Sequence, residues 1–136
     1  MPRRQPPAEP VWVSRLVMDA VHFDQLREHG GLAGLRDENT LEAVLARPKQ
    51  RWHYDPASDL GTLAAAYGWG LVTTHPYRDG NKRTAFLAMV VFLGLNDCDL
   101  EATQEEVVTT MLAAAAGQVS EAALADWVRS HLVKLA

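Results

Sequence analysis

An uninterrupted apolar segment, residues 85–95, constrains the fold of this chain more than any other stretch. Arranged as a helix, residues 85–93 would present hydrophobic side chains on every face, so no face is suited to water. The segment would extend only about 16 Å as a helix, whereas the core of a bilayer is roughly 30 Å thick. The sequence therefore predicts a central buried helix, spanning about residues 81–95, and no transmembrane segment.

The residues just before this apolar segment predict a site for phosphate. Pro76 and Gly80 indicate a loop, and the helix is expected to begin at Asn81. The first turn of a helix has about four main-chain N–H groups without partners, and the helix dipole makes that end partly positive. Lys82 and Arg83 add two cationic side chains at the same end. Such an arrangement is well suited to bind phosphate oxygens.

Two reactive side chains, His75 and Asp79, belong to the same loop. A histidine changes protonation near neutral pH and can act as a general base. A carboxylate suits Mg²⁺, which usually takes only one or two protein carboxylates. Taken singly, the histidine could be a helix-end residue and the aspartate a turn or N-cap residue. Their combination with the cations predicts an active site. The chain has no Walker A spacing, His-Glu-x-x-His, Gly-x-Ser-x-Gly or cysteine pair.

The remainder of the chain has helical periodicity and helix-capping residues. The predicted helices run from the N-cap Ser14 to Gly30, then over 38–47, 59–74, 81–95, 103–116 and 121–135. Ser58 is the predicted cap of the third helix, Pro48 is predicted to close the second, and 49–57 is predicted to be a loop. No segment alternates as a strand does, so we predict an all-α fold of five or six helices. Residues 13–136 are expected to form one domain, and the proline-rich residues 1–12 a flexible arm.

Charge and cysteine content exclude some classes of function. The net charge of −4 argues against a general nucleic-acid or membrane binder, whose surface would be basic. Cys98 is the only cysteine, which rules out an intrachain disulfide and is compatible with a cytoplasmic location. His22 falls within the first predicted helix, where a packing role is favoured over a catalytic one. The aromatic segment 52–54 is likewise expected to pack its loop onto the bundle.

The motif His-Pro-Tyr-Arg-Asp-Gly-Asn-Lys-Arg-Thr-Ala, residues 75–85, resembles the signature of the Fic/Doc (fido) superfamily. Its Asn-Lys-Arg form is that of the Doc, or death-on-curing, branch. Residues 30–37, residues 45–48 and the helical tail after Thr103 are also similar to Doc-like sequences, so the resemblance covers roughly residues 13–133. It implies ATP and Mg²⁺ as cofactors. The implied roles are a base (His75), a Mg²⁺ ligand (Asp79) and contacts to phosphate (Gly80, Asn81, Lys82 and Arg83). Tyr77 stands where the family usually has a loop-anchoring Phe, so its hydroxyl needs a partner.

Lys82 distinguishes the branches of this family. Fic enzymes that transfer AMP have a glycine at this position, whereas Doc-like proteins have lysine and transfer the γ-phosphate of ATP to elongation factor Tu, which arrests translation. The resemblance thus implies a toxin of a type II toxin–antitoxin pair, silenced by a small Phd-like antitoxin. The chain lacks the Ser/Thr-x-x-x-Glu-Gly/Asn motif of self-inhibited Fic proteins, as expected if a separate partner restrains it. Two alternatives remain: AMP transfer to a protein hydroxyl, and an inactive fido module that binds an antitoxin.

Overall fold

The computed structural model describes residues 8–135, which form six helices and two short strands. In chain order the elements are α1 (Arg15–His29), α2 (Glu38–Tyr54), α3 (Leu60–Thr74), α4 (Asn81–Leu95), β1 (Cys98–Leu100), α5 (Gln104–Ala115), α6 (Glu121–His131) and β2 (Leu132–Lys134). The predicted all-α class is confirmed, and α4 has the predicted bounds. No helix of residues 8–135 is long and apolar enough to cross a membrane.

Helix starts follow the local sequence closely. The side chains of Ser14, Asp37 and Ser120 each accept a hydrogen bond from the first turn of the helix that follows. Thr103 and Glu106 form the predicted capping box at the start of α5. The predicted cap of α3 was wrong by one residue, because Asp59 and not Ser58 accepts from the Thr62 N–H, at 2.8 Å.

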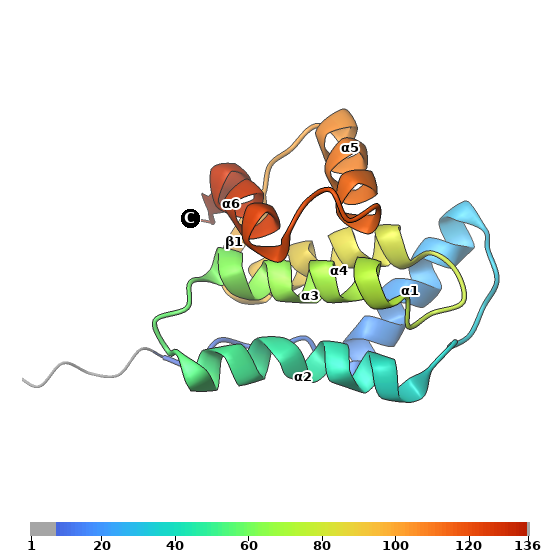
Figure 1. The fold of residues 1–136 in the computed structure, drawn as a ribbon, viewed down its shortest axis with the longest axis horizontal. Coiled ribbons are helices and arrows are strands. Elements are labelled where there is room, and N and C mark those ends of the chain that lie inside the picture. The colour runs from blue at the N-terminus through green and yellow to red at the C-terminus, as the bar shows by residue number, and fades with distance from the viewer. Residues whose placement is uncertain (1–7, 136) are drawn as a thin grey trace, which may run out of the picture.

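The centre of the bundle is α3, against which α2, α4, α5 and α6 all pack (Figure 1). Glycine and alanine along α3 allow this close approach: a β-carbon at Gly68 would lie 2.5 Å from the sulfur of Met89 on α4. Helix α4 is buried along the side that faces α3, through residues such as Phe92 and Leu93. Its other side is only half-buried. The all-α bundle was thus predicted correctly, but its centre is α3 and not the predicted helix 81–95, because the small residues of α3 let more helices surround it.

Two further predicted boundaries were wrong. Helix α2 does not end at Pro48 but continues to Tyr54 with the proline inside it, so residues 49–54 are helical and not loop. A proline within a helix removes one main-chain hydrogen bond. Burial of Pro48, and packing of Trp52 edge-on to Trp12 at 6.3 Å between ring centroids, help to offset that loss.

At the other end of the chain, α6 stops at His131 instead of Leu135. Residues 132–134 pair antiparallel with 98–100, with Leu100 opposite Leu132 and Cys98 opposite Lys134. Three residues of strand are too short to show a period-two pattern, which is why the sequence did not indicate this pair of strands.

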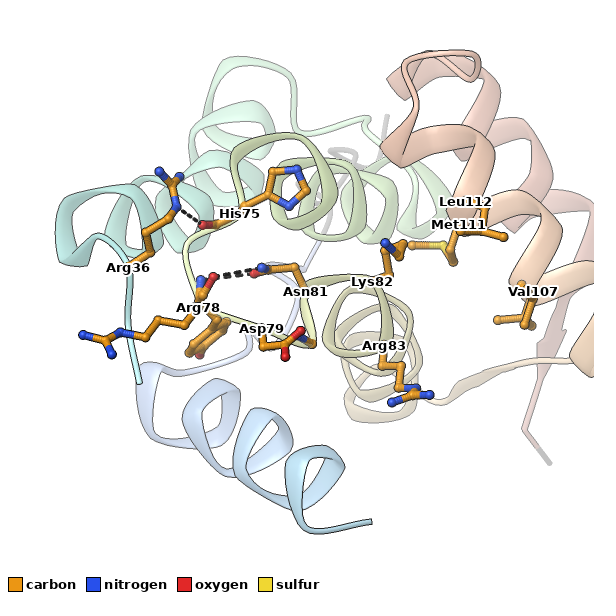
Figure 2. Close-up of a pocket in the computed structure, with 13 residues that line it drawn as sticks. Arg36, His75, Arg78, Asp79, Asn81, Lys82, Arg83, Val107, Met111 and Leu112 are labelled. Carbon is orange, nitrogen blue, oxygen red and sulfur yellow. Dashed lines mark hydrogen bonds between the residues drawn. The ribbon is translucent and has the colours of Figure 1, made fainter. Parts of the chain in front are cut away.

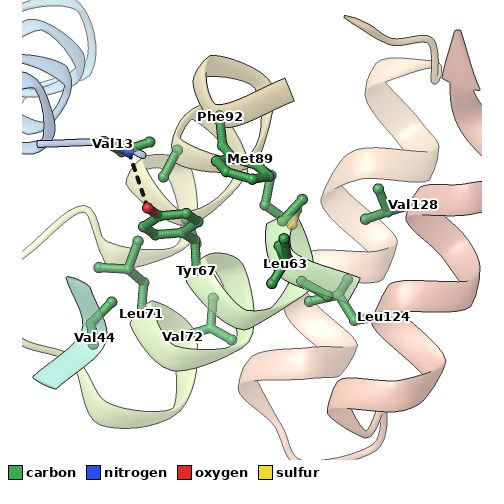
Figure 3. Packing of buried hydrophobic residues seen from close by; sticks show 14 of the residues in the cluster. Val13, Val44, Leu63, Tyr67, Leu71, Val72, Met89, Phe92, Leu124 and Val128 are labelled. Atoms are coloured by element: carbon green, nitrogen blue, oxygen red, sulfur yellow. Dashed lines mark hydrogen bonds between the residues drawn. The ribbon is translucent and has the colours of Figure 1, made fainter. Parts of the chain in front are cut away.

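The segment before α1 is attached to the core. The main-chain N–H of Val13 donates to the hydroxyl of the buried Tyr67, at 3.0 Å (Figure 3). Trp12 stacks on Phe92, with ring centroids 5.9 Å apart. Val11 exchanges main-chain hydrogen bonds with the side-chain amide of Asn96. The flexible arm predicted for 1–12 therefore does not include Val11 and Trp12, while its residues 1–7 lie outside the described part of the chain.

Candidate active site

The loop between α3 and α4 is held from within by Asn81. Its side-chain amide accepts from the Tyr77 N–H at 3.1 Å and donates to the Tyr77 carbonyl at 2.9 Å. Asn81 was expected to contact phosphate, but here its side chain is occupied by the loop itself, so any such contact falls to its main-chain N–H. The amide instead fixes the turn that leads into α4.

Tyr77 is buried and holds the loop against α1. Its hydroxyl donates to a carboxylate oxygen of Asp19 at 2.8 Å, which supplies the partner that the sequence required. Burial, and then the hydrogen bond to Asp19, raise the pKa of the Tyr77 hydroxyl, so the group remains protonated. The main chain of Tyr77 also forms an isolated antiparallel bridge with Leu35. The loop is thus fixed to the segment that follows α1.

His75 follows the last residue of α3 in a left-handed conformation, with φ 51° and ψ 61°. This conformation is uncommon for residues other than glycine and is often found at functional sites. Arg36 stabilises it, because its guanidinium donates to the carbonyls of His75, at 2.7 Å, and Thr74, at 2.5 Å. The imidazole of His75 is exposed on the side of the cleft described below.

Among the helices of residues 8–135, α4 alone begins without a capping side chain. Its N-cap is Gly80, with φ 75° and ψ 16°. A β-carbon at Gly80 would lie 2.0 Å from the side-chain nitrogen of Gln25, so glycine is required by both backbone conformation and space. Within the described part of the chain no side chain accepts a hydrogen bond as cap of this partly positive helix end, which remains available to an anion.

Asp79 precedes this helix end and is held by the loop after α1. One carboxylate oxygen accepts from the Gly80 N–H at 2.9 Å, and the other accepts from the Leu32 N–H at 3.3 Å. No group of three or more His, Cys, Asp or Glu side chains gathers as a metal site within residues 8–135. A single exposed carboxylate nevertheless fits Mg²⁺, which completes its shell with nucleotide oxygens and water.

The loop between α3 and α4 and the first turn of α4 line one cleft of about 520 Å³ (Figure 2). It contains every residue predicted for the site: His75, Tyr77, Asp79, Gly80, Asn81, Lys82 and Arg83. Figure 2 shows Lys82 and Arg83 projecting from the first turn of α4, with His75 above that turn and Asp79 beside it. The cleft is strongly cationic in a chain with a net charge of −4. Its lining includes Arg36, Arg78, Lys82 and Arg83, but only one carboxylate, that of Asp79.

The sequence did not indicate two parts of this cleft. One is Arg36, whose position in the glycine-rich segment before α2 gave no sign that it would reach the end of α3. The other is an apolar wall from α5, formed by Val107, Val108, Met111 and Leu112. Val108 and Leu112 are about half exposed, at 50% and 51%. An exposed apolar wall beside cationic side chains suits a ligand that has both a phosphate chain and an apolar part.

Comparison with known proteins agrees with this geometry. The sequence profile of the Fic/DOC family matches residues 12–93, which include the loop and most of α4. The chain is 31% identical to "Protein kinase doc" of Escherichia phage P1 over 110 residues, covering 81% of this chain and 86% of that protein. It is 39% identical to "Toxin Doc" of Mycolicibacterium smegmatis over 74 residues, covering 54% of this chain and 57% of that protein. The resemblance drawn from residues 75–85 is therefore confirmed: this chain belongs to the Fic/DOC family.

Proposed function

We propose that this chain is a toxin that acts as a protein kinase, transferring the γ-phosphoryl group of Mg-ATP to a protein hydroxyl. The observation that carries this proposal is the uncapped start of α4, with Lys82 and Arg83 beside it and the exposed His75 in the same cleft. A phosphate bound there has N–H groups, cations and a candidate base within one site. The phage relative, named a protein kinase, supports the same reaction class.

In the proposed reaction the oxygen of the target hydroxyl attacks the γ-phosphorus, while His75 accepts the hydroxyl proton. The bond between the γ-phosphorus and the bridging oxygen breaks, so ADP leaves and the target carries the phosphoryl group. Lys82, Arg83 and the N–H groups at the start of α4 stabilise the charge that spreads over the transferred oxygens. Arg36 maintains the backbone from which His75 projects.

The carboxylate of Asp79 is the residue that would hold Mg²⁺. Bound there, the ion would neutralise phosphate charge and orient the oxygens of the nucleotide. Two N–H groups, of Gly80 and Leu32, already fix the carboxylate in place. The ligand oxygens are thus positioned before any nucleotide binds.

The target and the restraining partner are part of the proposal. We propose elongation factor Tu as the substrate, and a small Phd-like antitoxin as the partner that silences the chain. The mycobacterial relative, named a toxin, supports a role in growth arrest.

The reaction is tested by incubating the purified chain with elongation factor Tu, Mg²⁺ and ATP labelled at either the γ- or the α-phosphorus. Label is expected to pass to the target from γ-labelled ATP only. Label from α-labelled ATP would identify AMP transfer and overturn the kinase assignment. Absence of transfer from both, together with tight antitoxin binding, would leave the inactive module as the function.

Variants test the assigned residues. His75→Ala is expected to reduce transfer by roughly 10²- to 10⁴-fold, as loss of a general base typically does. Asp79→Asn should abolish transfer, since the amide is a poor Mg²⁺ ligand, whereas the matched control Asp24→Asn changes an exposed acid outside the cleft. The transfer rate of Lys82→Ala is compared with that of Lys49→Ala, a control that removes an exposed lysine of α2. Wild-type rates in His75→Ala or Asp79→Asn would remove these residues from the mechanism.

A further inference from the structure

Helix α1 supplies a buried histidine that contacts the catalytic loop directly. His22 is 5% exposed, and its Nε2 lies 2.8 Å from the main-chain carbonyl oxygen of Asp79, 57 residues later in the sequence. Its ring also stacks on Tyr77, with centroids 3.7 Å apart and planes within 8° of parallel. His22 therefore packs within the bundle, as its sequence position indicated, but the residues it packs against belong to the site.

The hydrogen bond determines which ring nitrogen carries a proton. A carbonyl oxygen only accepts, so Nε2 of His22 must donate. The donor holds the main chain of Asp79, while the Leu32 N–H holds the carboxylate of the same residue. Gly31 leaves room for this arrangement, since a β-carbon there would lie 3.0 Å from a carboxylate oxygen of Asp79. The backbone and the side chain of Asp79 are thus both fixed by α1 and the loop that follows it.

We propose that His22 is a positioning residue, which sets the direction of the Asp79 carboxylate through the main-chain carbonyl of that residue. The inference rests on the proposed function for the role of Asp79, but the fixing of the loop by His22 can be measured without any reaction. Groups that orient a metal-binding side chain in this way typically change metal affinity or activity by about 10- to 100-fold when removed.

Two substitutions separate the hydrogen bond from the stacking. His22→Phe keeps an aromatic ring against Tyr77 but has no donor for the Asp79 carbonyl. His22→Gln loses the ring but can place an amide N–H near the position of Nε2. Met18→Ala serves as the matched control, because it weakens the buried face of α1 and leaves the hydrogen bond from His22 to Asp79 in place.

The first readout is hydrogen exchange of the loop amides in the absence of any ligand. In His22→Phe the amides of residues 77–80 are expected to exchange roughly three- to tenfold faster, the change that corresponds to loss of one hydrogen bond. His22→Gln is expected to remain near the wild-type rates. Wild-type rates in His22→Phe would overturn the proposal, and so would equal acceleration in His22→Gln or in Met18→Ala.

The second readout is the Mg²⁺ concentration that gives half-maximal transfer from γ-labelled ATP. It is expected to rise by about 10-fold or more in His22→Phe and to recover in His22→Gln. An unchanged Mg²⁺ dependence in His22→Phe would overturn the role assigned to His22. If the wild-type chain transfers no phosphate, the proposed function fails, while the exchange rates still decide whether His22 fixes the loop.

Discussion

Replacement of Gly80 by alanine tests whether the start of α4 depends on a residue without a side chain. Gly80 has φ 75°, and a β-carbon there would lie 2.0 Å from Nε2 of Gln25 and 2.8 Å from its Cδ. The left-handed conformation costs about 1–2 kcal/mol for a residue with a β-carbon. Crowding of a well-packed site adds about 1–3 kcal/mol. We therefore expect Gly80→Ala to lower the free energy of unfolding by about 2–5 kcal/mol.

Gln25 offers a way to separate these two costs. Its side chain is 1% exposed, and neither its amide nitrogen nor its amide oxygen has a hydrogen-bond partner within residues 8–135. Gln25→Ala removes a buried unpaired amide, which stabilises by about 1–3 kcal/mol, and loses one buried methylene group at about 0.8 kcal/mol. The single variant should thus be as stable as the parent chain or up to about 2 kcal/mol more stable. In the double variant only the conformational cost of alanine at position 80 should remain.

The assay is urea unfolding of four chains: the parent, Gly80→Ala, Gln25→Ala and the double variant. Each also carries His75→Ala, so that growth arrest does not limit expression. The expected coupling between the two substitutions is about 1–3 kcal/mol, with the double variant more stable than Gly80→Ala alone. Additive effects, within about 0.5 kcal/mol, would refute the argument that Gln25 occupies the space beside Gly80. A parallel ATP-binding measurement on the double variant shows whether relief of the contact also restores the phosphate site.

Three further outcomes are expected. Tyr77→Phe should lower the free energy of unfolding by about 1 kcal/mol in urea titrations, because Asp19 keeps its bond to Arg15, and transfer rates should be unchanged. Arg36→Ala should reduce the transfer rate by about tenfold in the labelled-ATP assay, since the carbonyls of Thr74 and His75 lose their donor. Hydrogen bonds to the Trp127 carbonyl and then to Glu106 raise the pKa of His131 above its ordinary 6.5, so its stabilisation is complete below that pH and is lost as the pH rises through the raised pKa. In urea titrations His131→Gln should therefore lower the free energy of unfolding most near pH 6, and nearly all of this loss should be absent near pH 9. A loss that is the same at both pH values would contradict this.

Local chemistry explains which parts of the fold were predictable. Caps such as Ser14 and Thr103 act within one turn of their own helix, so their neighbours in sequence contain the required information. Pro48 led to a wrong helix end for the opposite reason. The proline removes a main-chain hydrogen bond, but contacts with distant parts of the chain keep α2 helical beyond it. The rule that proline ends a helix reflects this lost hydrogen bond and not the tertiary packing that offsets the loss.

The site shows the same division. Residues 75–83 are contiguous, so their meeting in one cleft could be predicted from the motif alone. Arg36, the apolar wall of α5 and the bond from His22 to Asp79 join segments far apart in sequence. Nothing in the sequence near His22 distinguishes a histidine that contacts the loop before α4 from one that only fills the core.

The attachment of the N-terminal segment has a consequence for folding during synthesis. Val11 and Asn96, whose groups pair, are 85 residues apart in the chain. At about 5–20 residues per second, a ribosome completes that interval in roughly 4–17 s. Phe92, on which Trp12 stacks, is synthesised only near the end of this time. Contacts this distant in sequence close late, because the entropy of the intervening chain opposes them. Val11 and Trp12, although synthesised early, are therefore expected to be among the last residues to reach their native positions.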